Sequence, residues 1–141
     1  MTDILIAKTD SQINSCYPVL VQLRPQYTEQ QFLDQVKKQM QASYQLAFLQ
    51  DNGKVCAVAG YRYSDSLAWG KFLYVDDLVT DTTQRSKGYG KKLLGWLIEQ
   101  ARQNNCEQLH LDSGTQRKDA HRFYEREGMT FSSHHYQLDL R

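Results

Sequence analysis

A strand that runs into a basic, glycine-containing turn and then into a helix most constrains how this chain folds. Residues 71–80 predict a central strand, because apolar side chains occur at both parities. Residues 84–92 (QRSKGYGKK) follow, and a helix begins near Gly88. Glycines let backbone N–H groups approach a ligand, and the free N–H groups of a helix start favour an anion. Cations are unfavourable at an isolated helix N-terminus, so this cluster indicates a polyanionic ligand.

Two other phosphate-binding patterns do not fit this turn. A Walker A loop requires G-x-x-x-x-G-K-[ST], which no segment of the chain matches. A dinucleotide-binding fingerprint requires a third glycine three residues after the second, where this chain has Leu93. The sequence therefore supports neither kinase-like phosphoryl transfer nor nicotinamide binding.

Hydrophobic periodicity predicts an α+β fold in one domain over residues 1–141. Asp10 is expected to cap a first helix, and Thr28, with Gln31 at capping-box spacing, a second. Asn52-Gly53 predicts a type I′ turn between two strands. Strands are expected at residues 4–7, 44–50, 54–63, 71–80, 109–111 and 133–140, and further helices at residues 88–103 and 118–127. The chain thus predicts an antiparallel meander followed by strand, helix, strand, helix and strand.

Composition excludes several classes of protein. Among 141 residues, Lys and Arg number 17 and Asp and Glu 16, so a strongly basic nucleic-acid binder is not expected. No apolar run of about 18 residues predicts a membrane span, and the first residues lack the pattern of a secretory signal. Cys16, Cys56 and Cys106 are odd in number and far apart. We expect reduced thiols, no metal site and a cytoplasmic location.

Two segments resemble one protein family. Residues 85–90 (RSKGYG) resemble the R-x-x-G-x-G/A loop of the GNAT superfamily of acetyl-CoA-dependent N-acetyltransferases. Residues 119–129 (DAHRFYEREGM) look like the family's A-x-x-F-Y-x-x-x-G-F/M signature, one strand and one helix later. The resemblance implies a three-layer fold with a mixed, mostly antiparallel sheet of six or seven strands and about four helices on its faces. The sheet of this family splays between its fourth and fifth strands.

The resemblance also implies acetyl-CoA as co-substrate and the residues that bind it. In the family, backbone amides of the loop hold the pyrophosphate, which here implies Arg85, Ser86, Lys87, Gly88, Tyr89, Gly90 and Lys91. Pantetheine binds like an extra strand where the sheet splays, which implies Leu78, Val79 and Thr80, with an N–H near Leu78 or Val79 as oxyanion donor.

The second motif adds Arg117, Phe123 and Arg126 to the implied cofactor contacts. Arg117 stands where the family often has an asparagine that contacts pantetheine, which puts that amide contact in doubt. An arginine there could instead reach a phosphate or an acidic acceptor group. Arg126 matches a basic position near the cofactor's phosphates and is equally consistent with a solvated surface side chain.

Acetyl transfer from a thioester to an amine needs a neutral amine, donors to an oxyanion and a proton for the leaving thiolate. A thiol has a pKa of about 8.5 and a phenol about 10, so a tyrosine can share its proton with a developing thiolate. Tyr124 resembles the family's general-acid tyrosine; the alternative role is a core aromatic residue of its helix.

Asp77, with Asp76 as alternate, is the candidate base, acting directly or through water. Both interrupt an apolar strand, where a carboxylate is costly to bury without a partner. Because successive strand side chains point to opposite faces, we expect at most one of them to face the substrate. Hydrogen bonding to loop backbone or pairing with Arg62 is the structural alternative.

The acceptor amine is expected between the first two helices, the loop at residues 63–70 and the last strand. This region is rich in aromatic residues, which hold cations over their ring faces. The residues expected there are Tyr17, Arg24, Tyr27, Tyr61, Tyr63, Trp69, Tyr74 and Tyr136, although ordinary packing explains most of them. The four histidines show no metal-ligand spacing, and His135 is a candidate base or pocket wall.

The sequence therefore predicts an N-acetyltransferase in which a primary amine attacks acetyl-CoA directly, without a covalent enzyme intermediate. A transferase of another acyl group and a non-catalytic acyl-CoA-binding module remain open. The acceptor is a small molecule or a peptide or protein amine, whose identity the residues do not specify. Homodimers are common for this resemblance, but the sequence does not decide the oligomeric state.

Overall fold

The computed structural model describes residues 1–141 and divides the chain into two compact units, Met1–His110 and Leu111–Arg141. The first unit contains β1 (Thr2–Ile6), α1 (Asp10–Leu20), α2 (Glu29–Met40), β2 (Tyr44–Asp51), β3 (Lys54–Ser66), β4 (Gly70–Thr80), the 3-10 turn η1 (Thr82–Gln84) and α3 (Tyr89–Gln103). Strand β5 (Gln108–Leu111) reaches one residue past the end of this unit, and α4 (Lys118–Arg126) lies in the second. The predicted α+β class is confirmed.

The strands form one sheet in the order β1-β2-β3-β4-β5. Strands β1 to β4 pair antiparallel with their neighbours, which confirms the predicted meander. At the turn between β2 and β3, Asn52 has φ 52° and Gly53 φ 81°. Two positive φ angles are what a type I′ turn requires, so the dipeptide fixes the register of this hairpin.

Capping boxes begin both N-terminal helices. The Thr28 hydroxyl accepts from the Gln31 amide at 3.2 Å, and the Gln31 side chain accepts from the Thr28 amide at 3.0 Å, as the spacing predicts. At α1 the cap is Thr9, whose hydroxyl accepts from the Gln12 amide at 3.1 Å. The expectation that Asp10 caps this helix was wrong by one residue, because Gln12 gives Thr9 the same reciprocal pairing.

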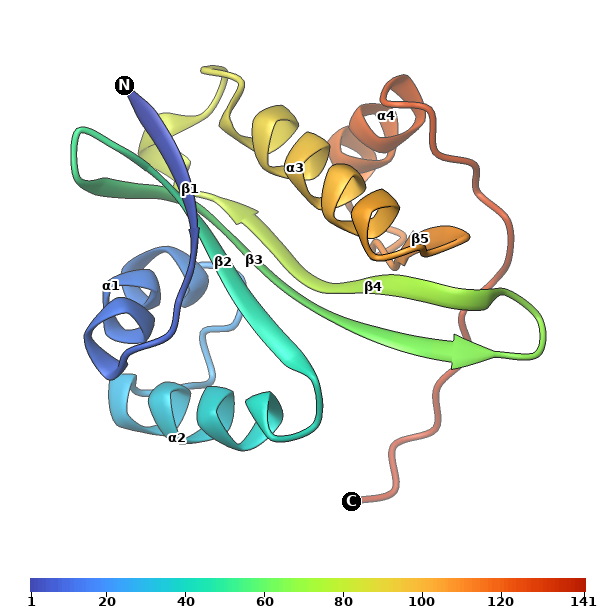
Figure 1. Ribbon diagram of the computed structural model, residues 1–141, viewed down its shortest axis with the longest axis horizontal. Coiled ribbons are helices and arrows are strands. Elements are labelled where there is room, and N and C mark those ends of the chain that lie inside the picture. Colours follow the sequence, from blue (N-terminus) through green and yellow to red (C-terminus); the bar gives the residue numbers. More distant parts are fainter. The chain divides into compact units, whose positions relative to one another are not determined.

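Helices cover both faces of the sheet within the first unit: α1 and α2 lie on one face and α3 on the other (Figure 1). Along β2, Leu46 and Phe48 belong to the core cluster with α1 and α2, whereas the intervening Ala47 and Leu49 are buried outside that cluster. This alternation is the period of a strand whose two faces are both covered. On α3 a stripe at helical spacing is buried, formed by Leu93, Leu94, Leu97 and Ala101.

A β-bulge interrupts β4. Gly60 pairs with Asp77 and Tyr61 with Val75, so Asp76 is an extra residue without a partner on β3. Glu107, just before β5, donates its amide to the Lys71 carbonyl at 2.8 Å. The four residues of β5 do not reach from there to the C-terminal end of β4, so β5 leaves that edge unpaired. All residues from Asp76 to Thr80 are only half-buried.

In the second unit, residues 129–141 contain no helix or strand. The expected strand at residues 133–140 was therefore wrong, and the sheet has five strands instead of six or seven. Alternation alone does not make a strand, because each strand needs a hydrogen-bonded neighbour, and Tyr136, Leu138 and Leu140 are exposed. No helix of the chain has the length and apolar character needed to cross a membrane.

Substitutions at two glycines test the effect of backbone conformation on stability without a steric clash, because each has open space where a Cβ would lie. Gly95 lies within α3, whereas Gly53 has φ +81°. We expect Gly95→Ala to raise the unfolding free energy by about 0.5–1 kcal/mol, because alanine favours a helix. Gly53→Ala should lower it by about 1–2 kcal/mol, because a Cβ disfavours the left-handed region. Urea denaturation measures both; equal shifts in the two variants would contradict this account.

Candidate functional site

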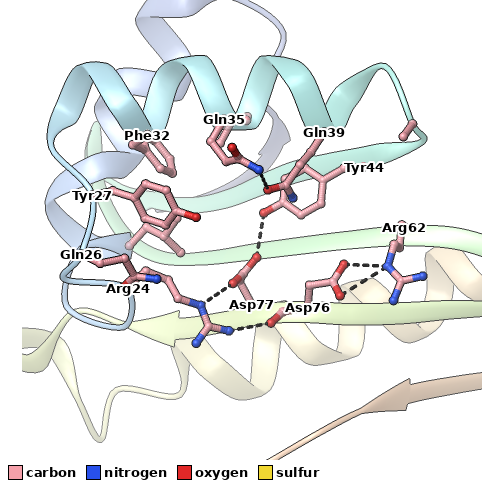
Figure 2. A pocket seen from close by; sticks show the side chains of 13 residues that line it. Arg24, Gln26, Tyr27, Phe32, Gln35, Gln39, Tyr44, Arg62, Asp76 and Asp77 are labelled. Atoms are coloured by element: carbon pink, nitrogen blue, oxygen red, sulfur yellow. Dashed lines mark hydrogen bonds and ion pairs between the residues drawn. The ribbon is translucent and has the colours of Figure 1, made fainter. Parts of the chain in front are cut away.

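A cavity of about 480 Å³ lies where the α1–α2 segment and α2 face the sheet beside the β4 bulge. The sheet contributes Asp76, Asp77, Arg62 and Tyr44, whereas Arg24, the amides and the other aromatic rings come from α2 and the segment before it (Figure 2). Its lining residues are Leu20, Arg24, Gln26, Tyr27, Phe32, Gln35, Val36, Gln39, Ala42, Tyr44, Arg62, Asp76 and Asp77. Both candidate bases therefore face one cavity.

Asp77 is held by a donor at each carboxylate oxygen. Arg24 Nε donates to its Oδ1 and the Tyr44 hydroxyl to its Oδ2, both at 2.9 Å. With its side chain only 13% exposed, both oxygens are occupied and shielded. Tyr44 reaches Asp77 across Gly60 on the intervening strand β3. A Cβ at Gly60 would collide with the Tyr44 hydroxyl and lie 2.7 Å from Asp77 Oδ2, so this contact requires glycine.

Asp76 is the more accessible of the two carboxylates. Its Oδ2 accepts from Arg62 Nε at 3.0 Å, and its side chain is 29% exposed. This is the pairing with Arg62 that the sequence offered as a structural alternative. Burial raises the pKa of Asp76 above its ordinary value, although the Arg62 guanidinium opposes this shift. Arg24 Nη2 also donates to the Asp76 carbonyl at 3.0 Å, which supports the bulge.

The alternation from which at most one of the two carboxylates was expected to face the substrate does not hold here, because both line the cavity. Strict alternation would send Asp76 and Asp77 to opposite faces. The bulge inserts Asp76 without a β3 partner and breaks that alternation. The acidic residues were visible in the sequence, but the bulge was not.

Part of the expected acceptor region lines the cavity. Arg24 and Tyr27 are among its lining residues, and the Tyr17 hydroxyl donates to the Tyr27 carbonyl at 2.6 Å. Tyr44 was not predicted as a site residue, because only the register of β2 and β3 brings it opposite Arg62. Phe32 was not predicted either; it belongs to the core cluster and also lines the cavity.

The other expected aromatic residues lie elsewhere. Tyr61 is fully buried and donates to Gln45 at 2.8 Å, and its ring meets the edge of Tyr63. Trp69 stacks on His110 with ring centroids 3.5 Å apart, and Tyr74 lies nearly parallel to the same imidazole. Tyr136 is exposed in the second unit. These side chains pack within the sheet surface or meet solvent.

The C-terminal end of β4 leads from the carboxylates to the basic turn. Leu78, Val79 and Thr80 are half-buried although they lie in a central strand, and β5 does not pair with their edge. Their backbone groups and apolar side chains can accept an extended ligand there. Gly90 packs against this end: a Cβ on it would lie 3.2 Å from the Thr80 hydroxyl.

The basic turn presents backbone amides and cations that have no acidic partners. Ser86 and Gly88 have φ 67° and 80°, and no side chain caps α3. Alternation of negative and positive φ turns successive N–H groups toward one side and is typical of anion-binding concavities. Arg85, Lys87 and Lys91 are exposed and form no ion pair; Lys87 donates to Gln84 at 2.8 Å. This donor set suits a diphosphate.

Tyr89 has a structural role in the same turn. Its side chain is buried, and its hydroxyl donates to Asp51 Oδ2 at 2.6 Å. This hydrogen bond raises the pKa of Tyr89 to about 12 and lowers the pKa of Asp51. The bond ties the first turn of α3 to the end of β2, so only the backbone of Tyr89 remains for a ligand.

The second unit holds the remaining predicted residues. Tyr124 lies on α4 beside Phe123, with ring centroids 5.4 Å apart, and burial raises the pKa of its phenol. The Arg126 guanidinium lies 5.8 Å from the centre of the Phe123 ring. Arg117 is the N-terminal cap residue of α4, without a side-chain capping bond. His135 faces Asp112 of the same unit at 3.5 Å.

Neither the cysteines nor the histidines form a second site. All three cysteines are free, and Cys16 and Cys56 are buried. Burial raises the pKa of the Cys16 thiol to about 12, which keeps it from acting as a thiolate nucleophile. No group of three or more His, Cys, Asp or Glu side chains is placed to hold a metal ion.

Comparisons with known proteins point to one family. The sequence model of the Acetyltransferase (GNAT) family matches residues 9–129. An uncharacterized N-acetyltransferase of Bacillus subtilis, YhdJ, is 38% identical over 120 residues, which is 84% of each chain. An aminoalkylphosphonate N-acetyltransferase of Salmonella typhimurium is 43% identical over 54 residues, which cover 38% of this chain and 35% of the relative.

A solved structure of an aminoglycoside N-acetyltransferase in complex with CoA has the same fold. It superposes with a TM-score of 0.85 at 13% identity, and the match covers 100% of this chain and 95% of that one. At this identity the likeness concerns the fold alone.

Tyr44→Phe tests the buried phenol beside Asp77. Burial and the Asp77 carboxylate raise the pKa of Tyr44 well above its ordinary value. Above about pH 10 the unfolded chain loses this proton while the folded chain keeps it, so rising pH favours unfolding. Between about pH 10 and 11, the unfolding free energy of the unmodified chain should fall by about 1 kcal/mol more than that of the variant. Urea denaturation across this range measures the difference, and parallel curves would contradict it.

Proposed function

The chain belongs to the acetyltransferase (GNAT) family, and from this premise we propose that it transfers an acetyl group from acetyl-CoA to a primary amine bound beside Asp76. One observation carries the proposal: the bulge brings two carboxylates to one cavity, directly before the half-buried end of β4. An amine in that cavity would lie next to the strand edge along which the resemblance implies pantetheine binding.

The residues present fit acetyl-CoA. The amides of residues 86–91 and the unpaired cations suit its diphosphate, and the left-handed φ of Gly88 shapes the turn. Leu78 to Thr80 offer an unpaired strand edge for the pantetheine arm. When bound, acetyl-CoA supplies an acetyl thioester, whose C–S bond is exchanged for a C–N bond to the amine. Arg117, Phe123 and Arg126 remain candidate contacts on α4.

Asp76 is the better candidate base. Both oxygens of Asp77 already accept hydrogen bonds, from Arg24 and Tyr44, so Asp77 positions the bulge and its neighbours. Asp76 receives only the Arg62 Nε and is more exposed. Its raised pKa increases its basicity toward an ammonium, which suits a base that accepts the proton of the amine.

Tyr124 is the candidate acid that returns a proton to the sulfur. Its phenol is protonated at neutral pH, as an ordinary phenol is, and burial raises its pKa further. The amine attacks directly: Cys16 and Cys56 are buried, and Cys106, which is partly exposed, does not line the cavity. An ammonium loses one proton to solvent before the attack. The resulting amine gives one proton to Asp76 and Tyr124 gives one to the sulfur, and proton exchange with solvent then restores the Asp76 carboxylate and the Tyr124 phenol.

Thiol release from acetyl-CoA with a panel of primary amines tests the activity. Acetyl-CoA should be preferred over propionyl- and succinyl-CoA if the acyl group is as proposed. CoA binding without thiol release on any amine would instead favour a binding module. A homodimer and a cytoplasmic location stay predictions from the sequence.

Gly88→Val tests the turn. A β-branched residue at φ +80° is strained, so the turn must rearrange and withdraw its amides from the diphosphate. We expect the dissociation constant for CoA to rise about tenfold or more in isothermal calorimetry, which corresponds to roughly 1.4 kcal/mol. The matched control is Gly95→Val, the same change about two turns further along α3. Equal CoA affinity of Gly88→Val and the control would exclude the turn as the binding site.

Asp76→Asn and Tyr124→Phe test the proton transfers. Each should lower kcat by about 10²–10⁴-fold while CoA affinity changes little, the range typical of general acid–base catalysis. Because Asp76 accepts a proton only when ionised, kcat/KM should decline as pH falls through its pKa, and Asp76→Asn should lose that limb. Full turnover in Tyr124→Phe would remove it as the acid, and an unchanged acid limb in Asp76→Asn would remove Asp76 as the base.

A further inference from the structure

The charged groups of the cavity are balanced. Its lining contains two carboxylates, Asp76 and Asp77, and two guanidiniums, Arg24 and Arg62, and every other lining side chain is uncharged at neutral pH. Each carboxylate receives an arginine Nε, and the two carboxylates lie side by side between Arg24 and Arg62 (Figure 2). A cavity that selected an amine by its positive charge alone would carry an excess of carboxylates.

The two arginines differ in the donors that they leave free. Arg24 uses Nε for Asp77 and Nη2 for the Asp76 carbonyl, so two of its three guanidinium nitrogens are engaged. Arg62 donates to Asp76 through Nε alone, and the two arginine side chains are equally exposed, at 41%. Its guanidinium carbon lies 4.9 Å from the centre of the Tyr74 ring, which fixes the plane of the group. The terminal N–H groups of Arg62 therefore remain available at the cavity.

We propose that the acceptor is a short primary amine that carries its own anionic group, with the amine at Asp76 and the anion on the terminal N–H groups of Arg62. This assignment rests on the proposed function. Guanidinium forks bind carboxylates and phosphonates through paired, charge-assisted hydrogen bonds. A zwitterion also leaves the charge balance of the cavity unchanged.

The geometry limits the length of the acceptor. Arg62 Nε lies 3.0 Å from Asp76 Oδ2, so groups that contact the two side chains at once are close neighbours. One to three carbon atoms between the amine and the anion match this spacing. A diamine would place its second cation against Arg62, and an alkyl amine would cover the guanidinium without pairing it, which costs free energy.

Four small amines distinguish these cases in a thiol-release assay with acetyl-CoA. They are β-alanine, 2-aminoethylphosphonate, n-propylamine and 1,3-diaminopropane, which differ mainly at the group distant from the reacting amine. We expect kcat/KM for at least one anionic amine to exceed that for n-propylamine by about tenfold or more, through KM, and the diamine to be poorest. The two anionic amines show whether carboxylate or phosphonate is preferred.

Arg62→Gln should reduce the preference for an anionic amine over n-propylamine to about twofold or less. Arg102→Gln is the matched control: Arg102 lies on α3, is 72% exposed, and should keep the full preference. Two results would overturn the assignment: equal kcat/KM for n-propylamine and the anionic amines, or a full preference retained in Arg62→Gln. Neither result would contradict the transferase activity itself.

Absence of thiol release with every amine would refute the proposed function, and calorimetry would then decide this inference separately. Heat on titrating 2-aminoethylphosphonate or β-alanine into the unmodified chain, lost in Arg62→Gln, would support the assignment of the cavity. No heat with either amine would overturn it.

Discussion

The bulge at Asp76 is the constraint on which the arrangement of this site depends. A regular β4 would send one of two consecutive carboxylates to the face covered by α3, whereas the extra residue brings both to one cavity. Three features hold the bulge: Arg24 donates to the Asp76 carbonyl, Asp77 bonds to Tyr44, and Gly60 leaves room for that bond. The irregularity of β4 thus places two carboxylates side by side at the cavity.

The basic turn after β4 breaks a local rule for a functional reason. Cations at a helix N-terminus oppose the helix dipole, and here they have no acidic partners. The turn is nevertheless anchored, because Tyr89 bonds to Asp51 and Gly90 packs on Thr80. A rigid turn with unpaired donors is organised for an anionic ligand before that ligand arrives.

Features that depend only on residues close together in the sequence could be predicted. Asn52-Gly53 specifies its turn, Thr28 with Gln31 specifies a helix start, and the stripe of α3 specifies its buried face. The carboxylates and the basic turn were also found, because unusual residues in a strand and at a helix start stand out locally. The strand expected at residues 133–140 shows the limit, since alternation does not supply a pairing partner.

The register in which the strands pair could not be predicted from the sequence. Tyr44 and Arg62 lie opposite each other only because of how β2 pairs with β3, and Gly60 separates Tyr44 from Asp77 only because three strands align. A one-residue shift in pairing would move these side chains to the other face of the sheet. The division of roles between Asp76 and Asp77 follows from that register, and no motif in the chain encodes it.

A crystal structure of the chain with CoA and an acceptor amine tests the central claim most directly. It should show the amine nitrogen within hydrogen-bond distance of the Asp76 carboxylate and the CoA diphosphate on the amides of residues 86–91. An amine bound outside the cavity, or a diphosphate held away from the turn, would contradict the account.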